Sequence, residues 1–190
     1  MRGRLLDAAV ECLAEVGYAR TTTVEVSRRA GVSRGAQLHY FPSRADLLTA
    51  AVGHVLDRRI EEFRKVMADA EPGADRLDTA IDVLWSMWSG PTFTAWLELR
   101  VAARTDPALA EALAEVERGF ATTSLDVFTE LFPFGADSPL PAELALTFTF
   151  TLMDGRALHA LVQSEGPTGP DRVIELLKQV ARLALPSERT

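Results

Sequence analysis

The sequence of 190 residues has a single cysteine, Cys12. One cysteine excludes an intramolecular disulfide and a zinc site built on thiolates. The three histidines, His39, His54 and His159, lack the spaced histidine or glutamate partners of a zinc motif, and no glycine-rich phosphate loop is present. We therefore expect neither a metal nor a cofactor. Cys12 falls on the buried side of a predicted helix, as a small apolar side chain would.

Long apolar runs are also missing. The longest, near residues 144–153, is interrupted by threonines and ends at Asp154, far short of the roughly 20 residues that cross a membrane. The N-terminus shows no cationic leader followed by an apolar stretch. With the single cysteine, these absences favour a cytoplasmic protein without a membrane segment.

Strand patterns are scarce, and the hydrophobic spacing and helix stops predict an all-α chain of nine helices. The predicted helices span residues 5–16, 23–30, 34–40, 46–70, 74–89, 92–105, 106–132, 142–164 and 171–185, with loops at 133–141 and 166–170. Apolar residues alternate with alanine or threonine at 144–152, which is typical of a strand. We still expect a helix there, because no second strand exists to satisfy its backbone groups.

A compact helix-turn-helix is predicted between Thr21 and Leu48. Thr22 and Glu25 have the spacing of a capping box. Gly31 stands where a helix ends in the left-handed region, and Ser33 can cap a second helix. Phe41-Pro42 ends that short helix. Two helices joined by a glycine-containing turn are the unit that places one helix in a DNA groove.

The motif that carries a family resemblance is Gly31-Val32-Ser33-Arg34-Gly35-Ala36, two further residues, His39-Tyr40-Phe41-Pro42-Ser43-Arg44, two further residues and Leu47-Leu48. It is preceded by Thr22-Thr23 and by the amphipathic helix from Leu5 to Val16, which ends at Gly17-Tyr18. This quarter of the chain closely resembles the TetR/AcrR family of transcriptional regulators. The resemblance implies an all-helical homodimer, with a DNA-binding domain at 1–48 and a ligand-binding and dimerisation domain at 49–190.

The resemblance also implies the DNA contacts. Thr22, Thr23, Tyr40 and Arg44 match family positions that hold phosphates, and Arg34, Gly35, Ala36 and His39 match positions near base edges. The full expected set is Thr22, Thr23, Ser33, Arg34, Gly35, Ala36, Gln37, His39, Tyr40 and Arg44. Arg34 is the best candidate for specificity, because a guanidinium can bind guanine O6 and N7 together; the alternative is a contact to phosphate alone.

The chain departs from the commonest family pattern at Gln37-Leu38, where an aliphatic residue followed by tyrosine is usual. Leu38 lacks the hydroxyl that would touch phosphate. Gln37 either reaches an adenine or is half-buried, and the sequence leaves both open.

Charge is divided unevenly along the chain. Residues 1–48 hold seven arginines and five acidic residues, a net charge of +2, whereas the remainder holds 13 basic and 22 acidic residues, a net charge of −9. The asymmetry favours contact of the first domain with phosphates. The excess of +2 is small and is also compatible with an ordinary solvated domain.

Two late helices are expected to form the dimer contact. Apolar residues surround the helix at 142–164, which indicates burial on both sides, and the helix at 171–185 has a broad apolar stripe. These helices could form a four-helix interface across a two-fold axis. The expected interface residues are Phe150, Met153, Gly155, Leu176 and Val180. The alternative is an ordinary buried core helix.

A cluster of aromatic residues around Gly90-Pro91 suggests an effector pocket. All three tryptophans lie between residues 85 and 96, and a broken helix leaves space. The expected pocket residues are Trp85, Trp88, Phe93, Trp96, Arg100, Arg104, Phe120, Phe148 and Leu152. Arg100 and Arg104 could admit one polar group, so the expected effector is mostly apolar, with an aromatic or weakly acidic character. The alternative is that these aromatics are simply core.

The expected function is a dimeric regulator, most simply a repressor, that binds a palindromic operator and is released by a small molecule. Two other classes remain as alternatives. A hydrolase would use Gly31-Val32-Ser33-Arg34-Gly35 as a G-x-S-x-G elbow, but that elbow needs a preceding strand. A helical adaptor would bind proteins and not DNA. His159 is expected to be a core or interface residue, and Asp154 is not assigned a catalytic role.

Overall fold

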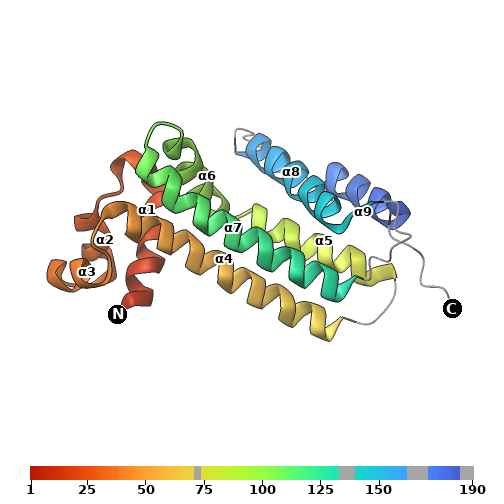
Figure 1. Cartoon of the computed structure of the whole chain (residues 1–190), viewed down its shortest axis with the longest axis horizontal. Helices are drawn as coiled ribbons and strands as arrows, with labels where there is room; N and C mark the ends of the chain where they lie inside the picture. The colour runs from red at the N-terminus through yellow and green to blue at the C-terminus, as the bar shows by residue number, and fades with distance from the viewer. Residues whose placement is uncertain (71–73, 133–139, 162–170, 185–190) are drawn as a thin grey trace. The chain divides into compact units, whose positions relative to one another are not determined.

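The computed structural model describes residues 1–70, 74–132, 140–161 and 171–184 and is shown in Figure 1. Within these residues it contains nine helices and no strand, which confirms the all-α prediction. The helices are α1 (Arg2–Arg20), α2 (Thr23–Ala30), α3 (Arg34–Tyr40), α4 (Arg44–Asp69), α5 (Ala74–Trp88), α6 (Pro91–Ala103), α7 (Pro107–Leu131), α8 (Ala142–Ala160) and α9 (Arg172–Ala184). The stretch with strand-like alternation lies inside α8.

Several predicted boundaries fall outside the described residues. These are residues 71–73 between the fourth and fifth predicted helices, most of the loop at 133–141, the loop at 166–170, and the predicted helix ends at 164 and 185. Elsewhere, α2 and α3 have the predicted bounds.

The first helix is longer than the predicted 5–16. It begins at Arg2 and continues as far as Arg20, but Gly17 interrupts it with φ 76° and ψ 169°. Glycine adopts such a conformation without the Cβ clash that other residues suffer. The hydroxyl of Thr21 donates to the Gly17 carbonyl at 2.8 Å and secures the turn.

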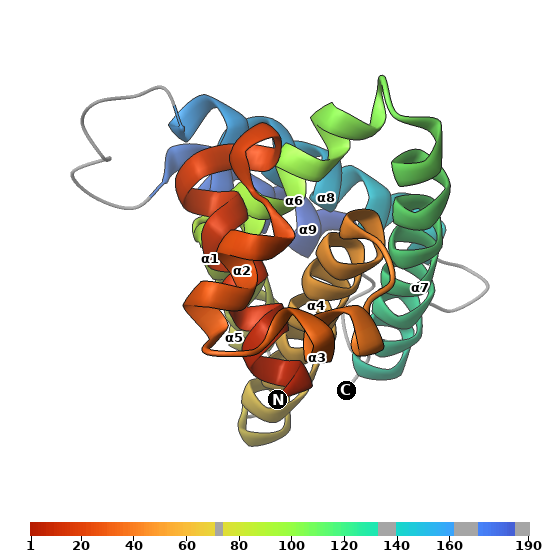
Figure 2. The same ribbon diagram turned by 90° about the vertical axis from the view of Figure 1, so that its left-hand side faces the viewer.

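By packing, the described residues divide into two compact units. The first comprises residues 1–60 and 90–122, and in it α1 packs on both α2 and α6; Figure 2 shows α1 and α2 together. Its core contains Leu5, Leu6, Leu13, Leu47, Leu48, Leu99 and Leu109. Because α6 packs on α1, this unit is larger than the predicted DNA-binding domain at 1–48. The boundary at residue 48 stays a prediction about function and does not describe the packing.

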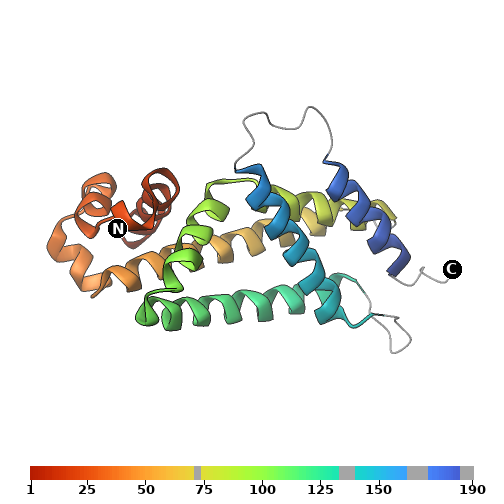
Figure 3. The ribbon, with the colours of Figure 1, turned by 90° about the horizontal axis from the view of Figure 1, so that it is seen from above.

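The second unit comprises the described parts of 61–89 and 123–190. In it α5 packs on α8 and α9, and α8 contacts α9, an arrangement visible in Figure 3. Its core contains Met67, Ile81, Met153, Ile174 and Leu177. A partly buried ion pair joins α8 to the residue before α9, since Arg156 Nε lies 2.6 Å from Asp171 Oδ2.

Candidate nucleic-acid interface

The turn between α2 and α3 is built by local hydrogen bonds. Thr22 Oγ1 accepts from the Glu25 N–H at 3.2 Å and caps α2. Gly31 ends α2 with φ 61° and ψ 40°, and the Val32 N–H donates to the Ser27 carbonyl. Ser33 Oγ then accepts from the Ala36 N–H at 3.2 Å and caps α3. The predicted helix-turn-helix is therefore present, with a cap, a left-handed glycine and a second cap in sequence.

Most of the residues predicted to touch DNA lie on the exposed side of this unit. We call the exposed residues of α3 and its cap the reading face; they are Ser33, Arg34, Gly35, Leu38, His39 and Tyr40. Ala36 and Thr23 are half-buried, and Thr22 is exposed at the start of α2. The rings of His39 and Tyr40 meet edge to face, with their centroids 5.4 Å apart.

Gln37 does not belong to this face. Its side chain is only 1% exposed, and its Nε2 donates to the Phe41 carbonyl at 2.9 Å. Gln37 Oε1 is buried without a hydrogen-bond partner. A side chain held under the helix cannot reach a base edge, so including Gln37 among the DNA contacts was wrong. The sequence could not decide this because a glutamine is compatible with either side of so short a helix.

Arg44 lies at the start of α4 and contacts the end of α1. Its Nε donates to the Thr21 carbonyl at 2.7 Å, and its Nη2 donates to the Tyr18 carbonyl. Its guanidinium also stacks 4.0 Å from the centre of the Tyr18 ring. Arg44 therefore stabilises the predicted DNA-binding domain at 1–48, which we call the head. The sequence analysis missed this role because the partners of Arg44 lie more than 20 residues away in the sequence.

The same turn is held from α6. The Tyr18 N–H donates to Glu98 Oε2 at 2.7 Å. A Cβ on Gly17 would lie 2.8 Å from that oxygen, so a side chain there would require the Glu98 carboxylate to move. Burial raises the pKa of the Tyr18 hydroxyl, so the phenol stays neutral near pH 7.

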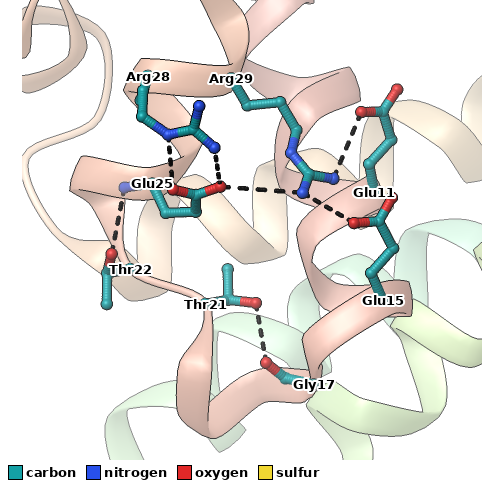
Figure 4. A network of polar contacts seen from close by, with 8 residues as sticks. All are labelled: Glu11, Glu15, Gly17, Thr21, Thr22, Glu25, Arg28 and Arg29. Carbon is teal, nitrogen blue, oxygen red and sulfur yellow. Dashed lines mark hydrogen bonds and ion pairs between the residues drawn. The ribbon is translucent and has the colours of Figure 1, made fainter.

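A network of charges joins α1 to α2, as Figure 4 shows. Arg28 binds the Glu25 carboxylate with two hydrogen bonds, and this lowers the pKa of Glu25. Arg29 lies 2.8 Å from Glu15 and 3.7 Å from Glu11. These two arginines are thus neutralised by neighbouring carboxylates. The net charge of +2 for residues 1–48 already includes these carboxylates, and the pairing shows which arginines they match.

The predicted effector residues are divided between the two units. In the first unit, Trp96 Nε1 and Arg100 Nε both donate to Glu117 Oε1, at 3.1 and 2.7 Å. The Arg100 guanidinium stacks 4.6 Å from the Trp96 ring, and Trp96 meets Phe120 edge to face. The charge of Arg100 is therefore already matched by a carboxylate. Phe93 is buried in this unit and Arg104 is exposed.

In the second unit, Trp88 Nε1 donates to Asp154 Oδ1 at 2.7 Å, and Phe150 packs against the Trp88 ring. Trp85 and Leu152 are half-buried and Phe148 is exposed. Asp154 thus anchors a tryptophan, which explains a carboxylate within an apolar helix.

An apolar cavity lies within the second unit. Phe63, Ile81, Phe128, Phe132, Leu146 and Leu177 are among the residues that line it, and Phe148 is the one predicted pocket residue in its wall. Thr149 is the one residue of this lining that has a polar side chain. The volume is about 60 Å³, below the roughly 150 Å³ that admits benzene. Periodicity marked these residues as apolar but could not show which helix faces converge.

The predicted interface residues have different environments. Leu176 and Val180 are exposed, Gly155 is exposed, and Phe150 is half-buried. Met153 has no exposed surface, so it cannot contact a second subunit in this arrangement. The large exposed apolar side chains of α8, α9 and the residue after α8 form what we call the apolar face; they are Leu144, Phe148, Leu158, Leu161, Val173, Leu176, Val180 and Leu183.

Comparison with known proteins agrees with this geometry. Residues 5–51 match the profile of the bacterial regulatory proteins of the tetR family, and residues 74–186 match the C-terminal region of BetI-type transcriptional repressors. The chain belongs to the TetR family. This is a family of transcriptional regulators rather than of enzymes. The G-x-S-x-G match accordingly lies on the turn between α2 and α3, without the preceding strand that a hydrolase needs.

Individual relatives support the assignment. The TetR-family chain is 33% identical to the regulator CymR of Pseudomonas putida over 165 residues, 86% of this chain and 81% of CymR. It is 39% identical to an uncharacterised helix-turn-helix regulator of Mycobacterium tuberculosis over 113 residues, which span 60% of this chain and 58% of that protein. A crystal structure of a TetR-family regulator from Rhodococcus sp. has the same fold, with a TM-score of 0.77, 21% identity and coverage of 97% and 98% of the two chains.

Other sequence predictions can be placed in the structure. Cys12 is buried, as predicted, and burial raises the pKa of its thiol. His159 is exposed, which excludes the core and leaves the interface as its predicted place. Among the helices that the structure describes, none is both long and apolar enough to span a membrane.

Proposed function

We propose that the chain is a transcriptional repressor that acts in the cytoplasm, binds a palindromic operator as a homodimer, and is released by a mostly apolar small molecule. The observation that carries the proposal is the reading face, which presents Arg34 to solvent on a short helix between two caps. A guanidinium on such a helix can bind the O6 and N7 of a guanine in the major groove.

Phosphate contacts would come from the edges of the same unit. Thr22 and Tyr40 are exposed, and Thr23 is half-buried beside them. Hydroxyl groups of this kind bind phosphate oxygens without reading sequence. Arg44 has a different role, since it holds the turn at the end of α1.

The apolar face supports dimerisation. Leu176 on α9 is 58% exposed, and Leu183 is 86% exposed. Two helices in contact that both carry exposed apolar side chains are suited to pack against the same helices of a second copy. We retain Phe150, Gly155, Leu176 and Val180 as interface residues and omit Met153, which is buried.

The effector proposal rests on the cavity of the second unit, which has Phe148 of the predicted residues in its wall, and it changes the expected chemistry. Arg100 is engaged by Glu117, and the cavity of the second unit has no charged residue among its lining side chains. These observations favour a neutral apolar effector. Because the cavity is small, such a molecule must displace side chains of α5, α7, α8 or α9 in order to enter.

The test of the DNA-binding function is selection of a preferred duplex from a random library, followed by titration of that duplex at several salt concentrations. A regulator should enrich a palindrome and lose affinity steeply with salt, by about 0.9 in the log–log slope for each phosphate neutralised. The adaptor alternative predicts that no duplex is retained at low salt.

The test of the switch is separate. Neutral apolar compounds that quench tryptophan fluorescence would be added to the repressor–operator complex. Release of the operator supports the proposal, and the ratio of operator affinities with and without the compound measures the coupling. Quenching without any change in operator affinity would refute the switch and leave the DNA-binding function standing.

A further inference from the structure

The reading face contains one large aliphatic side chain, that of Leu38. Leu38 is 48% exposed, although the other exposed side chains around it on α3 are polar, aromatic or absent. At 3.6 residues per turn, Leu38 lies one turn after Arg34 on the same side of the helix, and around the axis it falls between Arg34 and Gly35.

The exposure of Leu38 is fixed by the packing of α3. Gln37 and Phe41 are both buried, and the Gln37 amide donates to the Phe41 carbonyl. Rotation of α3 that would bury Leu38 would lift these two residues out of the core. The isobutyl group therefore stays on the surface that carries Arg34.

The chemistry of leucine restricts what it can contact on DNA. It has neither a donor nor an acceptor, so it cannot hydrogen-bond a phosphate or a base edge. In the major groove, the apolar group that a side chain can meet is the C5 methyl of thymine. The positive head and the Arg34 guanidinium match the charge of a duplex, which makes DNA the occupant that this face fits.

Gly35 allows the close approach that a methyl contact needs. A Cβ on Gly35 would meet no protein atom within 4 Å, so the space beside it is open. The missing side chain lets the backbone of α3 come near the bases, and apolar groups interact only within about 4.0 to 4.5 Å.

We propose that Leu38 is a specificity-determining residue that reads the methyl group of a thymine in each half-site of the operator. One helical turn is about 5.4 Å and one base step is about 3.4 Å. The thymine therefore lies one or two base pairs from the base that Arg34 contacts. This inference depends on the proposed DNA-binding function.

The experiment starts from the operator selected by the wild-type protein. Each thymine is replaced in turn by deoxyuridine, which removes the methyl and leaves base pairing intact. Wild-type protein should lose about fourfold in affinity at one position of each half-site, the effect of one buried methyl, and about 16-fold when both half-sites carry uracil. Leu38→Ala should bind the parent operator more weakly and be insensitive to uracil at that position.

Two controls make the result specific. Arg34→Ala should remain sensitive to uracil at the same position, because its own contact lies elsewhere. Leu38→Ala should keep the wild-type melting temperature, because the side chain is exposed. Full affinity of the wild type for every uracil-containing duplex, or undiminished uracil sensitivity of Leu38→Ala, would overturn the proposal while DNA binding stands. A protein that selects no duplex would refute the DNA-binding function itself, and the role of Leu38 with it.

Discussion

The reading face and the apolar face are both exposed, yet they are made of different residues. On α3 the exposed side chains are mainly polar or charged, with Leu38 as the large aliphatic one. On α8 and α9 the exposed large side chains are leucine, valine and phenylalanine. A surface that meets a hydrated polyanion needs donors and positive charge, whereas a surface that meets another protein gains most from apolar area. Exposure alone does not identify a binding site; its chemistry indicates the class of partner.

The largest expected effect comes from placing a charge on the apolar face. Leu176→Glu should convert the dimer to a monomer at micromolar concentration, because a carboxylate cannot be buried there without a partner. Operator affinity should fall by more than about a hundredfold, since the two heads would no longer bind as one linked unit. Sedimentation and operator titration measure the two effects.

The matched control for this change is Gln179→Glu, which adds the same charge to the same helix at an exposed polar position. It should leave the dimer intact. A dimer of Leu176→Glu as stable as the wild type would remove the apolar face from the interface.

The next largest effect is expected on the reading face. Arg34→Ala should cost about 1 to 3 kcal/mol of operator binding and blur the preference for the operator over random sequence. Competition between operator and random duplexes measures both quantities. Retention of the full preference by Arg34→Ala would show that Arg34 contacts only phosphate.

Arg44→Ala tests whether Arg44 stabilises the domain that carries the reading face. Loss of the guanidinium leaves the Tyr18 and Thr21 carbonyls without their donor, at a cost of about 1 to 2 kcal/mol. The melting temperature should drop by several degrees, and binding to all sequences should weaken alike. Arg20→Ala is the control, because Arg20 bonds only within its own helix at an exposed position. Weaker binding at an unchanged melting temperature would instead assign Arg44 to phosphate.

Two glycines test whether α8 contacts a second copy of the chain. Gly155 in α8 and Gly119 in α7 are both exposed, and a Cβ on either would meet nothing within 4 Å. Alanine at each should therefore favour its helix by up to about 1 kcal/mol. If α8 packs closely on a second copy, Gly155→Ala should weaken the dimer while Gly119→Ala does not, as measured by sedimentation on dilution. Equal dimer stability in the two variants would place Gly155 outside the contact.

The smallest effect concerns the charge network behind the reading face. The hydrogen bond from Arg28 holds the pKa of Glu25 below its ordinary value of 4.5. The stability that the carboxylate contributes is therefore fully present above about pH 4.5 and is lost as pH falls through the lowered pKa of the folded state. Glu25→Gln should melt slightly below the wild type at pH 7, and the difference should shrink below pH 4. A difference that stays constant with pH would contradict this role.

Local signals were sufficient for the parts of the fold that local bonds determine. The bounds of α2 and α3 could be predicted because Thr22, Gly31, Ser33 and Pro42 act within a few residues of themselves. The extent of α1 could not, because Gly17 is held in its turn by Glu98 and Arg44, which are distant in sequence.

The candidate sites show the same limit. Periodicity identified α8 as apolar on every side, but only packing shows that Met153 faces the core and Leu144 faces solvent. A charge count gave the head a positive sign, but only the structure shows that Arg28 and Arg29 are paired with carboxylates. The cavity depends on faces of five helices and has no linear signature.

The turn at Gly17 brings together three segments of the first unit. Glu98 of α6 accepts from the Tyr18 N–H, and Arg44 of α4 donates to the Tyr18 and Thr21 carbonyls. A hydrogen bond of 2.7 Å weakens once it stretches by roughly half an ångström. Sliding of α4 or α6 along α1 must therefore move Tyr18 with it or break one of these hydrogen bonds.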